Sequence, residues 1–418
     1  MEPSTKTPAH FASEKRIIIA GAGIAGLAFT RALDRYWPSG SPRPRITIYE
    51  RDTQEVSVER EGYSLSIRSD GASGGMQALQ KLGLLDSMLE MSITGLQGQK
   101  GTFMLWDVNW KPILKFKSPS QPPDGLPAPH MRIARNVLRR LLVEGLPSYA
   151  EVHWSSACRG VQRLPDGRVQ VELSDGQVDD CDILVIADGA NSKLRAVLRP
   201  DDKLCFAGAV CLSGSAKFTD GVPEPVDENW GLLLGGGGTS LFASPIDEDR
   251  AVWCLSYLSP ERREIVKPPL LRGTVDELLK ETLVRGKVFE QPFEQLVQAT
   301  DPSTFMLFNA MDKQPFVHSD IGSTPIIFIG DSNHAMSPFA GNGANMALMD
   351  GVELAEEVCK GVSLKSAVEK YDARSMPRSK RAIRQSHWVI NVAHAEGLRL
   401  AFWMVVLRIF NFLMRMKG

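Results

Sequence analysis

Cysteine is scarce in this sequence and is nowhere arranged in close pairs. The 418 residues include six cysteines, and no two of them form a C-x-x-C pair. Such pairs are the usual sign of a structural zinc site or a redox-active dithiol. We therefore predict no metal site, and we expect reduced thiols in a cytoplasmic protein. The sequence after Met1 also has no apolar signal segment, which agrees with that expectation.

An excess of charge of either sign is also missing. The chain has 48 basic and 49 acidic residues, which gives a formal net charge of −1 at pH 7. A protein with this balance has no overall field that would attract a polyanion. We therefore expect no nucleic-acid partner.

Only one stretch is apolar for long enough to raise the question of a membrane. Residues 398–414 are apolar except at Arg399, Arg408 and Asn411. A membrane-spanning helix needs about 20 mostly apolar residues, and an arginine well inside it, such as Arg408, is costly in the bilayer. Two interpretations stay open: a terminal helix packed on the body or on a second copy, and a helix in peripheral contact with a membrane surface.

Glycine, by contrast, forms an informative pattern near the start of the chain. The apolar run 16–20 predicts a buried parallel strand, and the pattern 24–36 predicts a helix. The segment GAGIAG at their junction has the spacing of a dinucleotide-binding turn, whose glycines allow a tight turn, approach of a pyrophosphate and close helix packing. The residues predicted to form this turn are Gly21, Gly23, Ile24, Ala25 and Gly26.

An acidic residue follows at the spacing that such a site requires. Residues 45–49 predict a second parallel strand, and Glu50 stands at its carboxyl end. A carboxylate about 20 positions beyond the glycine-rich turn commonly binds ribose hydroxyls. Glu50 therefore favours an unphosphorylated adenosine ribose, and it disfavours NADP at this site.

Two further segments place an aspartate directly after a predicted strand. Asp188 follows the strand predicted at 182–187, and Asp331 follows the one predicted at 325–329. Ligands of open α/β sheets bind at the carboxyl ends of the parallel strands. The three distant segments therefore predict one pocket for a large cofactor with a diphosphate, and FAD is the best candidate.

The order of the predicted elements indicates an α/β fold with an insertion. A prior of about 150 residues per domain suggests two or three units, and the α/β rhythm is interrupted between about 204 and 305 by β-like stretches. We predict a Rossmann-like FAD-binding domain, an inserted, mostly antiparallel β-sheet domain that binds substrate, and C-terminal helices. The predicted bounds are 14–203 and 315–372 for the FAD-binding domain, 204–314 for the substrate domain and 373–418 for the helical segment.

In order and spacing, the three segments resemble the motifs of one enzyme family. From Arg16 to Asp372 the chain is similar to the group A flavoprotein monooxygenases, the para-hydroxybenzoate-hydroxylase-like family, with its fingerprint, D-G and G-D motifs. The run PFAGNGAN at 338–345 is most similar to that of the compact tetracycline-inactivating members and of fungal secondary-metabolite hydroxylases. Gly330-Asp331-Ser332-Asn333-His334 departs from the G-D-A-A-H found in many members.

The resemblance implies roles for particular residues. It implies that Glu50 binds the adenosine ribose, that Arg51 and Arg135 hold the adenine and diphosphate side, and that Asp331 binds the ribityl chain. Asp188 and Arg195 match the D-G-x-x-S-x-x-R pattern, which is implicated in FAD and NADPH contacts. The loop implied to lie beneath the pyrimidine edge of the flavin contains Pro338, Gly341, Gly343, Ala344 and Asn345.

The resemblance also implies a reaction. NADPH, or NADH, would reduce FAD, and O₂ would form a flavin C4a-hydroperoxide that passes one oxygen atom to a hydrophobic aromatic or polycyclic natural product. The outcome would be hydroxylation, epoxidation or Baeyer–Villiger insertion. No catalytic residue is assigned, and the candidates near the reaction are Arg68, Phe242 and Phe339, for which a surface role (Arg68) or a core role (the phenylalanines) stays open.

Two alternatives stay open beside the monooxygenase. One is a flavin oxidase or reductase on the same fold. The other is a non-catalytic escort protein similar to the GDP-dissociation inhibitors, which keep the glycine-rich turn. The presence of both Asp188 and Asp331 favours an enzyme over the escort protein.

Overall fold

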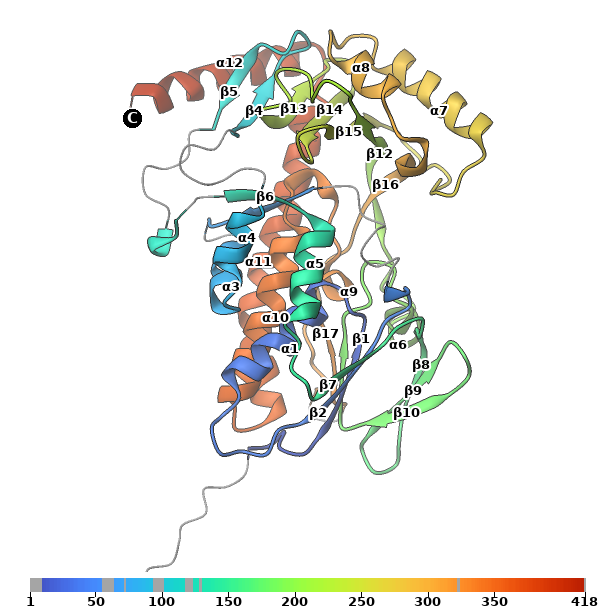
Figure 1. The fold of residues 1–418 in the computed structure, drawn as a ribbon, viewed down its shortest axis with the longest axis vertical. Coiled ribbons are helices and arrows are strands. Elements are labelled where there is room, and N and C mark those ends of the chain that lie inside the picture. The colour runs from blue at the N-terminus through green and yellow to red at the C-terminus, as the bar shows by residue number, and fades with distance from the viewer. Residues whose placement is uncertain are drawn as a thin grey trace, which may run out of the picture.

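The computed structural model describes residues 10–54, 64–70, 73–92, 101–116, 123–127, 130–321 and 324–416. Figure 1 shows a lower body built on a parallel sheet, an upper body built on a second sheet, and a long helix, α11 (Leu364–Ala393), that runs between them. The predicted α/β class with a second, mostly antiparallel sheet and C-terminal helices is confirmed.

A five-stranded parallel sheet forms the centre of the lower body. Its strands are short and rich in isoleucine and valine, which suits strands that are covered on both faces. All neighbouring strands in it pair in parallel. In order across the sheet the strands are β17 (Ile326–Phe328), β11 (Ile183–Ile186), β1 (Arg16–Ala20), β2 (Arg45–Tyr49) and β7 (Ala150–His153).

Helices cover one face of this sheet and a small sheet covers the other. Helix α1 (Ile24–Tyr36) packs closely on α10 (Gly343–Lys360), because a Cβ at Gly351 would lie only 2.6 Å from the backbone nitrogen of Phe29. The other helices of this body are α3 (Gly75–Lys81), α4 (Leu85–Glu90), α5 (Arg135–Glu144), α6 (Lys193–Leu198) and α9 (Asp331–His334). The small sheet contains β8 (Cys158–Arg163), β9 (Val169–Leu173) and β10 (Val178–Cys181).

A seven-stranded sheet forms the upper body. It is antiparallel except for the pair β13–β4. Its strands in order are β16 (Met306–Asp312), β12 (Cys205–Lys217), β15 (Arg250–Leu258), β14 (Thr239–Pro245), β13 (Trp230–Leu234), β4 (Phe103–Trp106) and β5 (Pro112–Lys115). Strands β4 and β5 belong to the range 14–203, so residues 204–314 do not build this sheet alone. Helices α7 (Arg272–Arg285) and α8 (Phe293–Gln298) pack on it through a shared apolar core.

A two-stranded pair connects the two bodies. Strand β3 (Ser64–Arg68) pairs in antiparallel fashion with β6 (His130–Ala134), and Figure 1 shows β6 at a level between the two large sheets. One face of the pair is apolar and buried, with Ile67, Met131 and Ile133 in the core of the lower body. The other face therefore carries the polar side chains of both strands.

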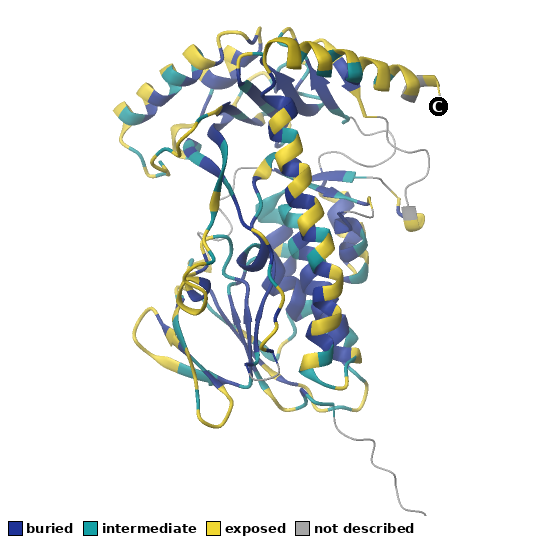
Figure 2. Ribbon diagram, turned by 180° about the vertical axis from the view of Figure 1, so that it is seen from behind, coloured by how far each residue is buried: buried dark blue, intermediate teal, exposed yellow. Residues whose placement is uncertain are grey.

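The chain ends in a helix that keeps part of its apolar surface exposed. Helix α12 (Gly397–Met416) packs on β5 and buries Leu407, but Phe402 and Phe412 are 59% and 62% exposed. Figure 2 shows exposed residues along much of this helix. Among the described helices, none alone is apolar over a bilayer-spanning length; only α11 and α12 together pass that test, across a bend of 112°. One face of α12 thus packs on the body of the protein, as one of the two interpretations predicted. No observation supports contact of this helix with a membrane surface.

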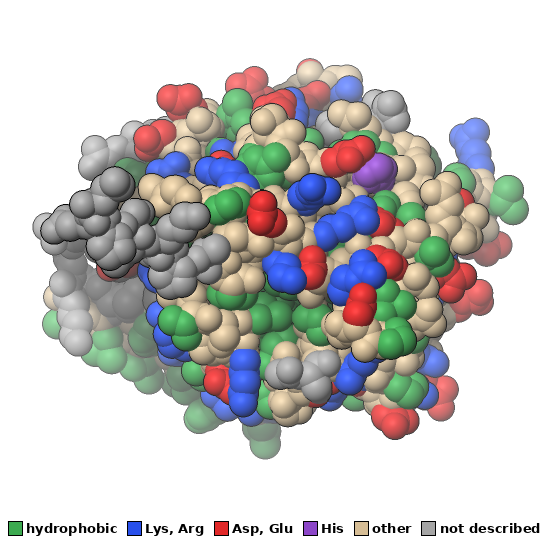
Figure 3. Space-filling model, turned by 90° about the horizontal axis from the view of Figure 1, so that it is seen from below, with side chains coloured by type: hydrophobic (Ala, Val, Ile, Leu, Met, Phe, Trp, Pro, Cys, Tyr) green, Lys and Arg blue, Asp and Glu red, His purple; other side chains and the backbone are tan. Residues whose placement is uncertain are grey.

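Charge is distributed evenly on the face that Figure 3 shows. On this underside, basic and acidic side chains alternate without a large area of one sign. This pattern agrees with the near-zero net charge of the sequence.

The short 3₁₀ helices are η1 (Pro123–Gly125), η2 (Pro302–Thr304) and η3 (Pro338–Ala340).

Candidate functional site

The three motif segments meet at the carboxyl edge of the parallel sheet. The backbone N–H of Ala187 donates to Ala20 O at 2.8 Å, and that of Ile329 donates to Ile186 O at 3.0 Å. Ser332 then donates its hydroxyl to Ile186 O at 2.7 Å. The predicted convergence of segments far apart in sequence is therefore present.

The glycine-rich turn has the geometry that its sequence predicts. Gly21 has φ +109°, and a Cβ there would lie 2.6 Å from Ala187 O. A Cβ at Gly26 would lie 2.3 Å from Gly21 O. Helix α1 begins after Gly23 without a capping side chain, so the amide groups of its first turn, which includes Ile24 and Ala25, are available to a ligand at its positive end.

Glu50 is buried and held from two sides. Its Oε2 accepts the backbone N–H of Ala22 at 2.8 Å and lies 3.2 Å from Nη2 of Arg139. Arg139 also donates from Nε to Ala22 O at 2.9 Å. Arg139 was not among the predicted site residues, although its position one turn after Arg135 on α5 was a signal. The side chain of Arg51 is 70% exposed and faces Asp52.

Two acidic side chains, Asp331 and Glu50, attract Arg135 electrostatically. Burial and the neighbouring Arg139 lower its pKa to about 10, against the attraction of Asp331 and Glu50. Burial raises the pKa of Asp331, and the attraction of His334 and Arg135 opposes that shift. Arg135, the first residue of α5, therefore interacts electrostatically with both carboxylates.

Most polar groups of the D-G segment, which contains Asp188 and Arg195, form hydrogen bonds within the segment. Asp188 Oδ2 accepts the backbone N–H groups of Lys193 and Leu194 at 3.0 and 3.4 Å, while its buried Oδ1 has no partner among the described residues. Burial raises the pKa of Asp188, against these hydrogen bonds. Arg195 donates to the carbonyls of Ala190 and Ser332 at 2.5 and 2.9 Å. It therefore ties the D-G segment to the G-D segment.

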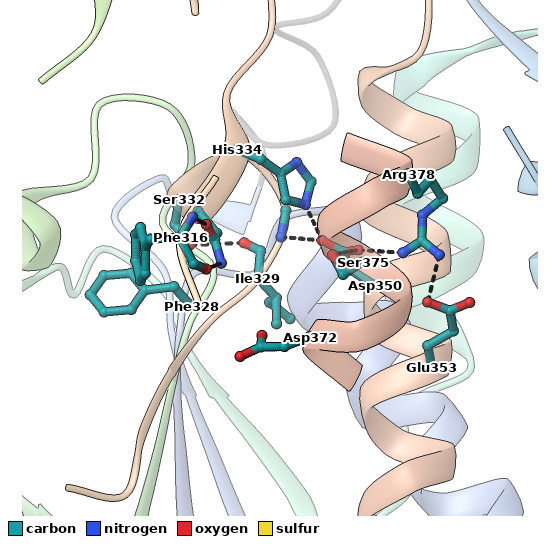
Figure 4. A network of polar contacts seen from close by, with 12 residues as sticks. Phe316, Phe328, Ile329, Ser332, His334, Asp350, Glu353, Asp372, Ser375 and Arg378 are labelled. Carbon is teal, nitrogen blue, oxygen red and sulfur yellow. Dashed lines mark hydrogen bonds and ion pairs between the residues drawn. The ribbon is translucent and has the colours of Figure 1, made fainter. Parts of the chain in front are cut away.

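A buried charge network fixes the G-D turn (Figure 4). Asp350 Oδ2 accepts the Gly330 N–H at 2.8 Å and pairs with His334 Nε2 at 2.5 Å. Its Oδ1 accepts Ser375 Oγ at 3.0 Å and Nη2 of Arg378 at 2.7 Å. These partners outweigh burial and hold the pKa of Asp350 far below its usual range. The carboxylate thus locks the turn, with φ +60° at Gly330, that presents Asp331.

The glycine-rich loop before α10 is open on one side. Pro338 is exposed, and a Cβ added at Gly341 or Gly343 would meet no atom within 4 Å. The side chain of Asn345 is already engaged, because it accepts the Arg68 N–H at 2.9 Å and donates to Ser66 O at 2.8 Å. The loop therefore has its backbone, including that of the half-buried Ala344, to offer to a ligand.

Arg68 lies between this loop and a cavity. Its guanidinium donates to Ser73 Oγ at 2.8 Å and to the side-chain oxygen of Asn342, and its Nε is 3.3 Å from Asp70. The cavity has a volume of about 440 Å³, and its other lining residues are Asp70, Arg381, Arg384, Gln385 and Trp388. Arg68 is thus not a freely solvated surface arginine.

The two candidate phenylalanines pack in different places. Phe242 on β14 lies against a cluster that includes Leu232, under α12, and its ring is 5.7 Å from the guanidinium carbon of Arg132. Phe339 stacks edge-on against His394 at 5.4 Å and packs with a separate cluster around Ile390. The two rings therefore pack in separate apolar clusters.

The sequence pattern of a family described as FAD binding domain matches residues 14–386. The chain belongs to this family. It is 40% identical over 402 residues to the monooxygenase cfoF of Aspergillus candidus, covering 94% of each chain. It is 27% identical over 429 residues to the FAD-dependent monooxygenase adaC of Aspergillus niger, covering 96% of this chain and 98% of that one.

Solved structures share the fold. HpxO of Klebsiella pneumoniae, complexed with FAD and uric acid, superimposes with a TM-score of 0.73 at 20% identity, covering 96% of this chain and 95% of that one. Tetracycline destructase Tet(51) gives a TM-score of 0.65 at 17% identity, with 97% and 98% covered. The family match and the two monooxygenase relatives confirm the predicted family, the FAD cofactor and the enzyme class, and the escort-protein alternative is not supported.

The described residues fit FAD on their own geometry. The Gly21 turn leaves no space for a side chain, the amide end of α1 is uncapped, and Asp188 Oδ1 and His334 Nδ1 are buried without partners. Buried polar atoms without partners are uncommon in native proteins and indicate a missing ligand or water. This family of FAD-dependent oxidoreductases typically uses NAD(P)H as the reductant.

Proposed function

We propose that this protein consumes NAD(P)H and O₂ to insert one oxygen atom into a hydrophobic aromatic or polycyclic natural product. The observation that carries the proposal is the convergence of the Gly21 turn, Glu50, Arg135 and Asp331 at the edge of the parallel sheet that faces the seven-stranded sheet. The printed names of the relatives, which are monooxygenases, support it.

FAD would lie along this edge. Glu50, fixed by Arg139, would bind the adenosine ribose, and Arg135 with the amide end of α1 would bind the diphosphate. Asp331, held in place by the lock at Gly330, would accept hydrogen bonds from the ribityl chain. The backbone of the loop at Gly341 and Gly343 would face the pyrimidine edge, where the start of α10 stabilises negative charge.

The protein's own part in the reaction is to position and to shield. Bound FAD supplies the redox chemistry, accepting a hydride from NAD(P)H and activating O₂. The loop 338–345 is held to β3 by the hydrogen bonds of Asn345, and this contact would fix the position of the flavin ring system. The seven-stranded sheet above it would hold the substrate and exclude water from the reacting oxygen. Hydroxylation, epoxidation and Baeyer–Villiger insertion all fit these tasks.

Isotope labelling under ¹⁸O₂ tests the proposal. With NADPH and a panel of aromatic and polycyclic phenols, we expect one ¹⁸O atom in the product and faster NADPH consumption in the presence of substrate. Formation of H₂O₂ with an oxidised but unlabelled product would instead establish the alternative, a flavin oxidase. No reaction with any member of the panel would leave the proposal without its substrate class and count against it.

The placement of FAD has a separate test. Asp331→Ala is expected to weaken FAD retention by about tenfold or more, because a hydrogen bond to a charged group contributes about 1.5–3 kcal/mol. Flavin content after gel filtration measures this loss. Asp276→Ala, which changes an exposed aspartate on α7, is the matched control. A fully FAD-loaded Asp331→Ala variant would contradict the role given to Asp331.

A further inference from the structure

The polar face of the β3–β6 pair carries two arginines, Arg68 and Arg132, and the histidine His130. The register places Ser66 opposite Arg132 and Arg68 opposite His130, and alternation along each strand turns all four side chains to the same face. This face lies toward the seven-stranded sheet, since the His130 ring is 5.1 Å from the ring of Trp230 on β13.

Arg132 is the most deeply buried of these cations. It is 3% exposed, and it donates from Nη1 to Ser66 Oγ at 2.9 Å and from Nη2 to Ser64 O at 3.1 Å and to Ser64 Oγ. All of these partners are neutral. Its Nε is buried and has no partner, and no carboxylate of a described residue lies within ion-pair distance of it.

Aromatic rings form the other wall around this cation. The guanidinium carbon of Arg132 lies 5.9 Å from the centre of the Trp230 ring and 5.7 Å from that of Phe242. A cation–π contact contributes about 0.5–2 kcal/mol, whereas the effective penalty for burying a charge is several kcal/mol. The surroundings therefore do not compensate the charge, and an anion entering this place would.

Arg132 also lies close to the loop 338–345, which we expect beneath the flavin. Asn345, in the first turn of α10, bonds to the β3 backbone at Ser66 O and at the Arg68 N–H. Ser66 is the residue that faces Arg132 across the pair. Arg132 therefore stands one strand away from the segment that is fixed to the loop, on the side of the seven-stranded sheet.

We propose that Arg132, with Ser64 and Ser66, is the subsite that binds an anionic oxygen of an aromatic substrate whose ring lies against Trp230 and Phe242. The proposal rests on the proposed function and narrows its substrates to acidic aromatic compounds. The anionic oxygen belongs to a carboxylate or to an ionised phenol or enol. Arg132 is thus a residue that determines specificity.

Equilibrium dialysis of the FAD-loaded enzyme with small aromatic probes tests the subsite. We use 2-naphthoate with its neutral analogue 2-naphthamide, and 4-nitrophenolate with its neutral analogue nitrobenzene. At least one anion is expected to bind about tenfold or more tightly than its neutral analogue, as a charged hydrogen bond predicts. The pair with the larger ratio identifies the carboxylate or the phenolate as the source of the oxygen.

Variants of one residue decide whether Arg132 is responsible. Arg132→Met is expected to abolish the preference for the anion, Arg132→Lys to keep part of it, and Arg262→Met, at an exposed arginine after β15, to leave it unchanged. A wild type that binds neither anion or shows no preference would overturn the proposal. So would an Arg132→Met variant that keeps the preference, or one that only loses FAD, since the arginine would then serve the cofactor.

The result is separable from the test of the proposed function. Dialysis measures binding and needs no turnover, NADPH or O₂. A preference that depends on Arg132 together with an absence of ¹⁸O incorporation would retain the subsite and reject the monooxygenase. Incorporation of ¹⁸O without any preference would do the reverse.

Discussion

Two buried arginines show how differently the two halves of this molecule treat charge. Arg378 on α11 donates to Asp350 at 2.7 Å and to Glu353 at 2.6 Å. Burial lowers its pKa, but the attraction of these two carboxylates outweighs burial and raises it. Burial alone lowers the pKa of Arg132 to about 9, because only serine and aromatic groups surround it.

The two arginines differ in role: Arg378 stabilises the fold, and Arg132, as we propose, binds a ligand. The Arg378 network is complete, and it fixes the backbone at Gly330, which is part of the cofactor cradle. Among the described residues around Arg132, no negative charge compensates the charge of its guanidinium. An uncompensated buried charge destabilises a protein, and a ligand of opposite charge that binds beside it relieves that cost.

The largest expected effect comes from breaking the complete network. Asp350→Asn leaves Arg378 and the His334 contact without their carboxylate, so we expect a loss of about 3–5 kcal/mol in the free energy of unfolding. Urea unfolding followed by circular dichroism measures it. A loss below about 1 kcal/mol would show that the network does not stabilise the fold.

Replacing each arginine by methionine sharpens the comparison. Arg378→Met leaves two buried carboxylates unpaired, and we expect a loss of about 3 kcal/mol. Arg132→Met removes a buried cation that has no counter-ion, and we expect the free energy of unfolding to stay the same or to rise. Equal losses in the two variants, measured in the same urea experiment, would remove the distinction between them.

The pH dependence of stability gives a smaller and more specific effect. His334 and Arg378 hold the pKa of folded Asp350 far below the value of about 3.9 expected in the unfolded chain. A depressed folded-state pKa stabilises the protein above the unfolded pKa, and this stabilisation is lost as the pH falls toward the folded value. The difference in unfolding free energy between wild type and Asp350→Asn should therefore be constant from pH 7 to about pH 5 and narrow below about pH 4. A difference that does not change down to pH 3 would contradict this assignment.

The smallest effect concerns the aromatic wall around Arg132. Trp230→Leu removes one of the two cation–π contacts of Arg132, each worth about 0.5–2 kcal/mol. We expect the affinity for whichever anion wild type prefers to fall by about threefold, with FAD content unchanged. Trp37→Leu, at a buried tryptophan that follows α1 in the lower body, is the control. Equal losses in the two variants would show that the ring of Trp230 has no special role.

Local sequence patterns predicted the parallel sheet well. The runs at 16–20, 45–49 and 182–187 are strongly apolar and β-branched, and each of them contains a strand of that sheet. Strands β4 and β5 were not assigned to the seven-stranded sheet, because membership in a sheet depends on hydrogen bonds between distant segments. Four residues of β4 carry no signal of the partner that they will pair with.

The candidate site was predictable where backbone geometry dictates the residue. Gly21 must be glycine because of its positive φ and the nearby Ala187 carbonyl, and the sequence motif records that requirement. Arg139 and Arg378 were missed because an arginine on a helix is usually solvated, and only the packed structure shows its partner. Asn345 was expected in the loop beneath the flavin; it lies in the first turn of α10, and its side chain binds β3.

The sequence by itself determined the glycine-rich turn, the carboxylate after β2 and the two aspartates at strand ends, because these depend on local conformation and on the shared direction of parallel strands. Only the tertiary structure decided which buried charges are paired. Arg378 meets Asp350 across two packed helices, and Arg132 meets only serines and rings across two sheets. Charge compensation is a property of the packed neighbourhood, and the order of residues along the chain does not record it.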